Sequence, residues 1–189
     1  IKIGINGFGR IGRLILRALL ENYKDQIQVV AINDLGSIEA NAHLVKYDST
    51  HGTLPYDVEA SKDGFKILNQ NIKVFAERDP VNLPWGKEGV DVVLECTGLF
   101  LDKTSAAKHI KAGAKKVIIS APAKDVDFTI VQGVNSNDLK KEHNVISNGS
   151  CTTNCLAPVA MVLEKNFGIE YGYMTTIHSY TGDQKLLDT

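Results

Sequence analysis

Two residues near the carboxyl end of the chain, Cys151 and His178, have the types needed for nucleophilic chemistry. Cys151 opens an expected helix over residues 151–166, where unpaired amides and the helix dipole favour a thiolate. His178 follows an apolar run and ends an expected strand over residues 171–178. A histidine there can take the thiol proton and then act as a general base. The pair predicts a cysteine nucleophile activated by a histidine.

Hydroxyl and amide groups flank both members of this pair. Ser150, Thr152 and Thr153 surround the cysteine with hydroxyls and backbone donors suited to an oxyanion or a phosphate. Thr181 and Gly182, just after the histidine, offer a hydroxyl and a backbone amide to an anion. These residues predict that the site binds an anion.

The other cysteines and histidines have ordinary explanations. Cys96 ends an expected buried strand, and Cys155 lies one turn after the nucleophile on the same helix face, so both are expected to be packed and inert. A Cys-x3-Cys pair without nearby partner ligands lacks the usual zinc spacing, and we expect no metal site. The remaining histidines are expected on the surface or as core filler: His43, His51, His109 and His143.

The start of the chain carries a second pattern, a glycine-rich turn between a strand and a helix. The turn consists of Gly7, Phe8, Gly9, Arg10, Ile11 and Gly12. Gly7 allows a tight turn, Gly9 lets the backbone approach a pyrophosphate, and Gly12 lets helix and strand pack closely. In this context the turn predicts a dinucleotide site.

Asp34 ends the next expected strand about 20 residues later, the spacing of a ribose-binding acid. It would accept a hydrogen bond from the ribose 2′-hydroxyl and repel a 2′-phosphate, which selects NAD over NADP. Arg10 can add charge-assisted bonds to the phosphates. The alternative is a glycine turn followed by a helix-capping aspartate.

Three further residues are either cofactor contacts or ordinary loop residues. Thr97 and Ser120 follow expected strands at their carboxyl ends, where such sheets bind ligands. Arg78 lies in a loop from which it could reach the adenine side.

These residues are positioned by strands that alternate with helices, which predicts an α/β fold with a doubly wound, mostly parallel sheet of the Rossmann type. Residues 48–83 are punctuated by glycine and proline and predict a small antiparallel excursion. The expected strands are residues 1–6, 27–32, 90–95, 116–120, 128–132 and 145–147. The other expected helices are residues 13–22, 37–47 and 104–112.

Composition narrows the class of protein. The 189 residues are 43% hydrophobic and 23% charged with a net charge of −1, so neither a nucleic-acid nor a membrane surface is indicated. The opening apolar run is too short for a signal peptide. Three cysteines without a regular framework favour a reducing compartment, and we expect a cytoplasmic protein.

Taken together, these motifs closely resemble the phosphorylating glyceraldehyde-3-phosphate dehydrogenases. The resemblance runs essentially end to end and covers the amino-terminal half of that family and a little more. Its markers are residues 6–13 (NGFGRIGR), 31–34 (AIND), 95–98 (ECTG), 119–122 (ISAP), 147–155 (SNGSCTTNC) and 176–184 (TIHSYTGDQ). It implies an NAD-binding Rossmann domain over residues 1–150 and the beginning of an α+β catalytic domain over residues 151–189.

The resemblance also implies a reaction. Cys151 attacks the aldehyde carbon of glyceraldehyde 3-phosphate, and His178 removes the proton of the thiohemiacetal as hydride passes to NAD. Inorganic phosphate then cleaves the thioester to give 1,3-bisphosphoglycerate, a step of glycolysis. Family counterparts of Ser150 and Thr152 help to bind substrate and attacking phosphate, and that of Thr181 holds the phosphate of the substrate. Counterparts of Arg10, Ile11, Asp34, Arg78 and Ser120 contact NAD, and the family is typically a cytosolic homotetramer.

Two departures qualify the resemblance. Gly149 stands where the family usually has alanine, which would loosen the turn before the nucleophile. The sequence stops at Thr189, before the family's phosphate-clamping arginines and nicotinamide-orienting asparagine, and we expect the natural protein to continue.

Three alternatives stay open at this point. The sibling enzyme erythrose-4-phosphate dehydrogenase shares the cysteine and cofactor chemistry, but residues 180–182 look like the triose-phosphate enzyme. A cysteine hydrolase would use Cys151 and His178 but has no use for the glycine turn or Asp34. A non-catalytic NAD-binding fragment is what the visible residues alone would make.

Overall fold

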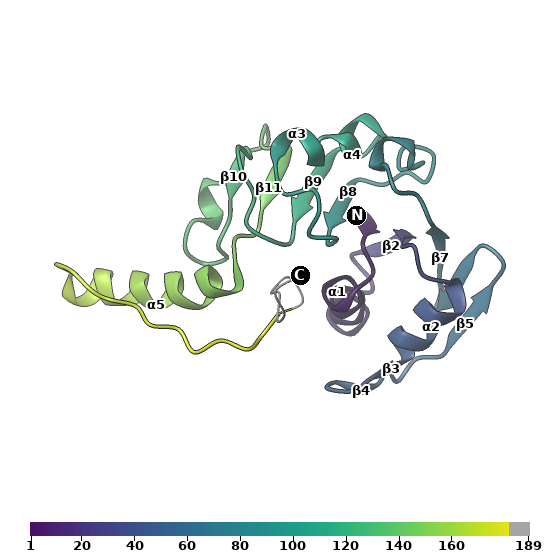
Figure 1. The fold of residues 1–189 in the computed structure, drawn as a ribbon, viewed down its shortest axis with the longest axis horizontal. Coiled ribbons are helices and arrows are strands. Elements are labelled where there is room, and N and C mark those ends of the chain that lie inside the picture. Colours follow the sequence, from purple (N-terminus) through teal and green to yellow (C-terminus); the bar gives the residue numbers. More distant parts are fainter. Residues whose placement is uncertain (182–189) are drawn as a thin grey trace, which may run out of the picture.

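The chain folds around one nine-stranded sheet, seen in a computed structural model that describes residues 1–181 (Figure 1). The strand order is β10-β11-β9-β8-β1-β2-β7-β6-β5. Strands from β10 to β7 pair in parallel, and β6 and β5 continue antiparallel. The strands are β1 (Lys2–Asn6), β2 (Gln28–Asn33), β5 (Val58–Ser61), β6 (Gly64–Ile67), β7 (Gln70–Phe75), β8 (Val92–Glu95), β9 (Lys116–Ile119), β10 (Phe128–Thr129) and β11 (Val145–Ser147).

Helices fill most of the connections between these strands, and a small hairpin follows the second helix. The expected helix over residues 104–112 is two short helices that meet at Ala107, which keeps a helical φ of −62°. The helices are α1 (Arg10–Asn22), α2 (Ile38–Lys46), α3 (Lys103–Ala106), α4 (Lys108–Lys111) and α5 (Cys151–Phe167). Two 3-10 turns, η1 (Pro80–Asn82) and η2 (Ser136–Asp138), and the hairpin strands β3 (Tyr47–Asp48) and β4 (Gly52–Thr53) complete the elements.

Both faces of the sheet are covered. Ile3 and Ile5 of β1 pack with the apolar side of α1 and with α2 in one hydrophobic cluster. Between them, Gly4 faces the other way, because a Cβ built on it would lie 2.9 Å from Trp85. Trp85 belongs to a second cluster that includes α3, and successive side chains of a strand point to opposite faces. This arrangement confirms the expected doubly wound α/β fold.

The strand order reverses beside β1. From β1 the chain builds β2 and β7 on one side, and it then crosses back to build β8, β9, β11 and β10 on the other. The connections after β1 and after β8 therefore leave the same edge of the sheet in different directions. Such a switch point is where open parallel sheets form a ligand crevice.

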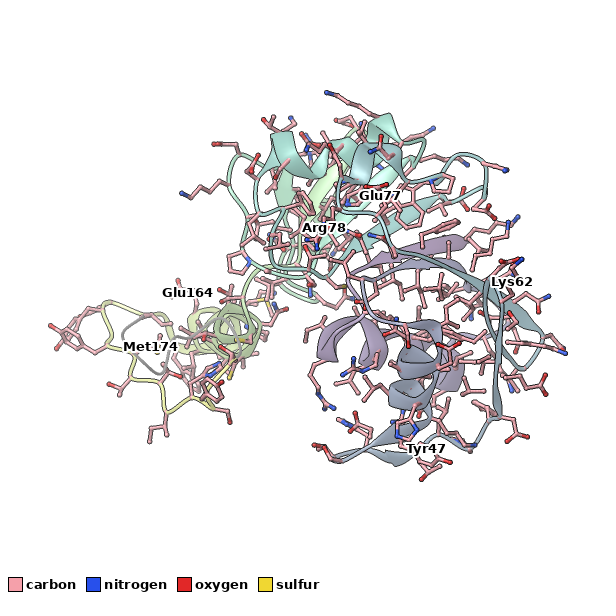
Figure 2. The ribbon with its side chains drawn as sticks, turned by 45° about the vertical axis from the view of Figure 1, so that its right-hand side comes forward. Tyr47, Lys62, Glu77, Arg78, Glu164 and Met174 are labelled. Carbon is pink, nitrogen blue, oxygen red and sulfur yellow. The ribbon has the colours of Figure 1, made fainter. Side chains whose placement is uncertain are left out.

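The segment after β11 departs from the sheet. α5 projects away from it, and the following residues run back along the helix (Figure 1). Glu164 and Met174 mark this arm, apart from the body of the sheet (Figure 2). Apolar side chains along α5 are exposed, with Val159 at 55% and Phe167 at 82%.

The prediction of a strand over residues 171–178 is wrong. These residues have no regular secondary structure and are exposed. An apolar, β-branched run forms a strand only where another strand can pair with it, and within residues 1–181 none lies beside this segment. The same described part of the chain contains no helix long and apolar enough to cross a membrane.

Candidate active site

The glycine turn after β1 is built by close backbone approach. Gly7 has a φ of +88°, and a Cβ on it would lie 2.7 Å from the backbone nitrogen of Thr97. A Cβ on Gly12 would lie 2.3 Å from the carbonyl oxygen of Gly7. Both positions therefore require glycine, one for the left-handed turn and the other for the packing of α1 on it.

The first turn of α1 is open to a ligand. Gly9 is the N-cap residue, and no side chain caps the helix. A Cβ on Gly9 would meet no atom within 4 Å, so the backbone faces free space. Unpaired amides and the positive end of the dipole make this an anion-binding position that fits a pyrophosphate.

A cavity of about 410 Å³ lies at the carboxyl ends of the central strands. Figure 2 shows two of its residues, Glu77 and Arg78, near the middle of the molecule. Six predicted cofactor residues line it: Gly7, Phe8, Gly9, Asp34, Arg78 and Thr97. Its other lining residues are Asn6, Asn33, Leu35, Glu77, Cys96, Leu99 and Phe100.

Asp34 holds the loops at the mouth of this cavity. Its Oδ2 accepts a hydrogen bond from the Phe8 amide at 2.8 Å, and its Oδ1 accepts one from the Gly36 amide at 2.8 Å. Oδ1 also accepts a longer hydrogen bond from the Asn41 side chain at 3.5 Å, so the second lone pair of Oδ2 is the site that remains for a ligand hydroxyl. The carboxylate thus fits a ribose while it orders the glycine turn.

Four predicted cofactor residues lie outside the cavity lining. Gly12 is inside α1, Ile11 is half exposed, and Arg10 forms an ion pair with Asp48. Ser120 follows β9 and hydrogen-bonds to the Cys96 thiol. These side chains are therefore not grouped with the six that surround the cavity.

The nucleophile candidate occupies the first position of α5. The hydroxyl of Ser150, the N-cap residue, accepts a hydrogen bond from the Thr153 amide at 2.9 Å. Asn154 ties the helix to the preceding turn by donating to the carbonyl oxygen of Asn148 at 2.7 Å. Gly149 has a φ of +68°, which a glycine adopts without the strain an alanine would meet. The sequence NGSCTTN thus folds into a capped helix start with the thiol exposed.

Cys151 and His178 are brought together despite the missing strand. The Cys151 Sγ lies 3.1 Å from the His178 Nε2. On the other side of the ring, Nδ1 lies 2.5 Å from the carbonyl oxygen of Ser179, which can only accept. Nδ1 therefore carries a proton, and in the neutral ring Nε2 is the nitrogen that can accept one from the thiol.

The surroundings of Cys151 favour the thiolate. The hydrogen bond with His178 is the largest cause that lowers the pKa of Cys151 from its ordinary value, and hydrogen bonds from the Thr152 amide and hydroxyl act in the same direction. By contrast, burial raises the pKa of the Cys96 thiol to about 12. The two thiols are thus separated by environment into a reactive and an inert one.

The remaining predictions about this region concern the other two cysteines, Thr181 and the cavity. Cys96 is half buried as expected, whereas Cys155 is exposed, so the prediction that it packs is wrong. Within residues 1–181, no residue of α5 is buried. Thr181 is exposed, three residues beyond His178. Neither Cys151 nor His178 lines the cavity at the glycine turn.

Several residues that line the cavity were not predicted from the sequence as cofactor contacts. Asn6 and Asn33 are the last residues of β1 and β2, and Glu77 follows β7. The rule that selected Thr97, a polar residue at the carboxyl end of a parallel strand, also applies to them. His109 was expected as core filler, and it is fully buried beside Glu95.

The fold and the glycine turn define a Rossmann-type dinucleotide-binding protein. A family model described as glyceraldehyde 3-phosphate dehydrogenase, NAD binding domain, matches residues 1–103, and one described as the C-terminal domain of the same enzyme matches residues 150–189. The chain belongs to the glyceraldehyde 3-phosphate dehydrogenase family. Its first match agrees with NAD as the expected cofactor.

Similar curated proteins carry the same name. The chain is 57% identical to glyceraldehyde-3-phosphate dehydrogenase of Pseudomonas aeruginosa, 58% to that of Geobacillus stearothermophilus and 56% to that of Xanthobacter flavus. Each alignment covers 100% of this chain but only 56–57% of the relative. The chain therefore spans little more than half the length of these relatives.

Proposed function

We propose that the protein to which this chain belongs is an NAD-dependent, phosphorylating glyceraldehyde-3-phosphate dehydrogenase. The observation that carries the proposal is the 3.1 Å contact between the Cys151 Sγ and the His178 Nε2 at the start of α5. A dinucleotide-binding fold alone would suit many reactions. A histidine-activated cysteine restricts the choice to chemistry that passes through a covalent sulfur adduct.

NAD would be held by the glycine turn and its surroundings. The amides at the start of α1 would bind the pyrophosphate, with Gly9 leaving room for it. Asp34 would accept a hydrogen bond from a ribose hydroxyl, and Thr97 and Arg78 would line the adenosine end. When bound, NAD supplies the acceptor for the hydride that leaves the substrate.

The residues of this chain would then act in two steps. Nε2 of His178 takes the thiol proton of Cys151, and the thiolate attacks the aldehyde carbon. The protonated histidine then returns this proton to the alkoxide that forms, which gives a thiohemiacetal and leaves Nε2 unprotonated. The same nitrogen later takes the hydroxyl proton of that adduct, so that oxidation leaves a thioester. Inorganic phosphate then displaces the sulfur and releases the acyl phosphate. Ser150, Thr152 and Thr181 supply hydroxyls for the phosphate groups.

Activity assays on the complete natural protein test this proposal. Formation of NADH should require glyceraldehyde 3-phosphate, NAD and inorganic phosphate together. Cys151→Ala should lower the rate by at least about 10³-fold, because no covalent adduct can form. Cys155→Ala is the matched control, since it removes an exposed thiol from the same helix. NADH formation that survives in Cys151→Ala would refute the proposal.

We also propose the domain division and assembly that the resemblance implies. Residues 1–150 would form the NAD-binding domain and residues 151–189 the beginning of the catalytic domain. The complete protein would be a cytoplasmic homotetramer that acts in glycolysis. Light scattering on the purified natural protein tests the assembly, and a monomer under assay conditions would refute it.

A further inference from the structure

A buried polar network lies beneath the cofactor cavity, and the proposed chemistry does not use it. Its centre is Glu95, the last residue of β8, whose side chain is completely buried. Its one ionisable partner among the described residues is His109 of α4, which is also completely buried. A buried carboxylate is costly unless its oxygens are fully hydrogen-bonded, so the arrangement of its partners is informative.

Four donors saturate the carboxylate of Glu95. Oε2 accepts hydrogen bonds from the Asn6 Nδ2 at 2.5 Å and the His109 Nε2 at 2.9 Å. Oε1 accepts from the Thr97 amide at 2.8 Å and also from the Thr97 hydroxyl. Because every contact comes from a donor, the ionised carboxylate, which only accepts, is the form that fits.

The tautomer of His109 is fixed from its other side. The Trp85 indole nitrogen, which can only donate, lies 2.9 Å from the His109 Nδ1. Nδ1 is therefore the acceptor, and Nε2 carries the proton that it donates to Glu95. The buried pair is a neutral imidazole that supports a carboxylate.

The network reaches three loops that surround the cavity. Asn6 accepts from the Asn33 side chain at 2.7 Å, and Asn33 in turn binds both the amide and the carbonyl of Glu77 at 2.8 Å each. On the other side, the Thr97 hydroxyl accepts from the Leu99 amide at 3.0 Å. The loops after β1, β7 and β8 are thus joined through one carboxylate.

The direction of each bond in this chain is fixed. The backbone of Glu77 presents one donor and one acceptor, which sets the orientation of the Asn33 amide. Asn33 sets that of Asn6, and Asn6 then presents its NH₂ group to Glu95. No amide can be turned around without a donor facing a donor.

We infer that Glu95 and His109 are positioning residues that fix the three cavity loops for NAD binding. This inference rests on the proposed binding of NAD in that cavity. Neither side chain lines the cavity, so their effect must pass through Asn6, Thr97 and Glu77. The carboxylate aligns the end of β1 with that of β8, and the histidine keeps the carboxylate in place.

Substitutions in the complete natural protein test the inference, with the dissociation constant of NAD measured by calorimetry. Glu95→Gln replaces an oxygen by an NH₂ group that must face a donor, so NAD binding should weaken roughly 5- to 100-fold. His109→Leu should weaken it in the same direction. His109→Gln should restore near wild-type binding, because glutamine offers an acceptor to Trp85 and a donor to Glu95. Glu59→Gln, at an exposed position of β5, is the control.

The outcomes separate this inference from the proposed function. Wild-type protein that fails to bind NAD overturns the proposed function, and the inference falls with it. Wild-type protein that binds NAD, with Glu95→Gln and His109→Leu within twofold of it, overturns the inference alone. Equal losses in His109→Gln and His109→Leu would also overturn it, because a merely space-filling role would not distinguish polar from apolar replacements.

If the variants do not fold, amide hydrogen exchange on the wild-type protein tests whether the network fixes the cavity loops. The amides of Thr97 and Glu77 donate to buried side-chain oxygens. They should exchange as slowly as amides inside β1, even without NAD. Rapid exchange typical of a surface loop would contradict the inference.

Discussion

At the scale of single residues, environment rather than residue type distinguishes the cysteines. Cys151 lies at a helix start with a histidine nitrogen 3.1 Å from its sulfur, and its pKa is lowered mainly by that hydrogen bond. Cys96 follows β8 and packs against the hydrophobic cluster of β1 and α1, and burial raises its pKa to about 12. The lowered pKa gives Cys151 a larger thiolate fraction than Cys96 at the same pH, and the thiolate is the nucleophilic form.

The first prediction concerns His178→Asn. Because the histidine lowers the pKa of Cys151, its removal raises that pKa and reduces the thiolate fraction at any given pH. The rate of alkylation by iodoacetamide at neutral pH should fall about tenfold for each unit by which the pKa rises. The rate should recover at higher pH. Peptide mass spectrometry at a series of pH values measures it.

His143→Asn serves as the control, since the His143 ring stacks on Phe128. An alkylation profile of His178→Asn that matches the wild-type profile would show that the contact does not activate Cys151.

The second prediction concerns Asp34→Ala. This change removes the proposed acceptor for the ribose and releases the Phe8 amide that Asp34 holds at 2.8 Å. NAD binding should weaken roughly tenfold or more, and NADP should not gain what NAD loses, because the turn itself is loosened. Titration of both nucleotides measures the effect, with the exposed Asp25→Ala as control. Unchanged NAD affinity would exclude Asp34 from the site.

At the scale of residues, the sequence alone predicts those residues whose role depends on their near neighbours in the chain. Cys151 at a helix start and Gly7 in a turn are recognisable from their immediate neighbours. Glu95 and His109 are not, because their contact joins positions 14 residues apart through the packing of α4 on β8. The exposure of Cys155 was missed for a similar reason, since helical spacing says which residues share a face but not what covers that face.

At the scale of elements, α1 and the turn before it form the anion-binding position. Gly12 is needed for packing, Gly7 for the turn and Gly9 for neither, since the space beside it is empty. The three glycines of one motif therefore have different physical reasons. This difference can be measured.

The third prediction contrasts Gly9→Ala with Gly7→Ala. Gly9→Ala should leave the thermal unfolding midpoint within a few degrees of the wild-type value but weaken NAD binding about tenfold, because the methyl group occupies the space proposed for the phosphates. Gly7→Ala should lower the midpoint itself, because its Cβ would lie 2.7 Å from the Thr97 nitrogen. Gly172→Ala, also in open space, is the control. Full NAD affinity in Gly9→Ala would contradict the proposed position of the pyrophosphate.

The fourth prediction concerns Asp127, which joins α3 to the edge of the sheet. Its carboxylate forms an ion pair with the Lys103 Nζ at 2.6 Å. It also accepts hydrogen bonds from the backbone amides of Asn144 and Val145 at 2.9 Å each. Asp127→Ala should lower the free energy of unfolding by about 1–3 kcal/mol at neutral pH. The exposed Asp138→Ala should have little effect.

The pH dependence of this effect has a definite sign. The hydrogen bond from Lys103 is the largest cause that lowers the pKa of Asp127, to about 2, whereas an unfolded aspartate has a pKa of about 3.9. A lowered pKa stabilises the folded state above pH of about 4, and this contribution is lost as the pH falls towards 2. The difference between wild type and Asp127→Ala should therefore shrink below pH of about 4. A difference that stays constant down to pH of about 2 would contradict this assignment.

At the scale of the whole molecule, the chain consists of a packed Rossmann-type sheet and an exposed arm (Figure 1). The alternation of strands and helices predicted the sheet, because each parallel strand is a short apolar run bounded by turn residues. The segment 171–178 has the composition of a strand, but strand formation depends on a neighbour that composition does not reveal. For the same reason, the sequence predicted that α5 is a helix but did not predict which of its faces would be exposed.

The proposed function requires that Cys151 form a thioester during oxidation of the aldehyde. The most direct test mixes the complete natural protein with NAD and glyceraldehyde 3-phosphate without inorganic phosphate, and analyses the quenched protein by mass spectrometry. We predict a burst of about one NADH per site and an acyl group on the Cys151 peptide, which disappears when phosphate is added. NADH formation without an adduct on that peptide, or an adduct on Cys155 that persists in Cys151→Ala, would contradict the account.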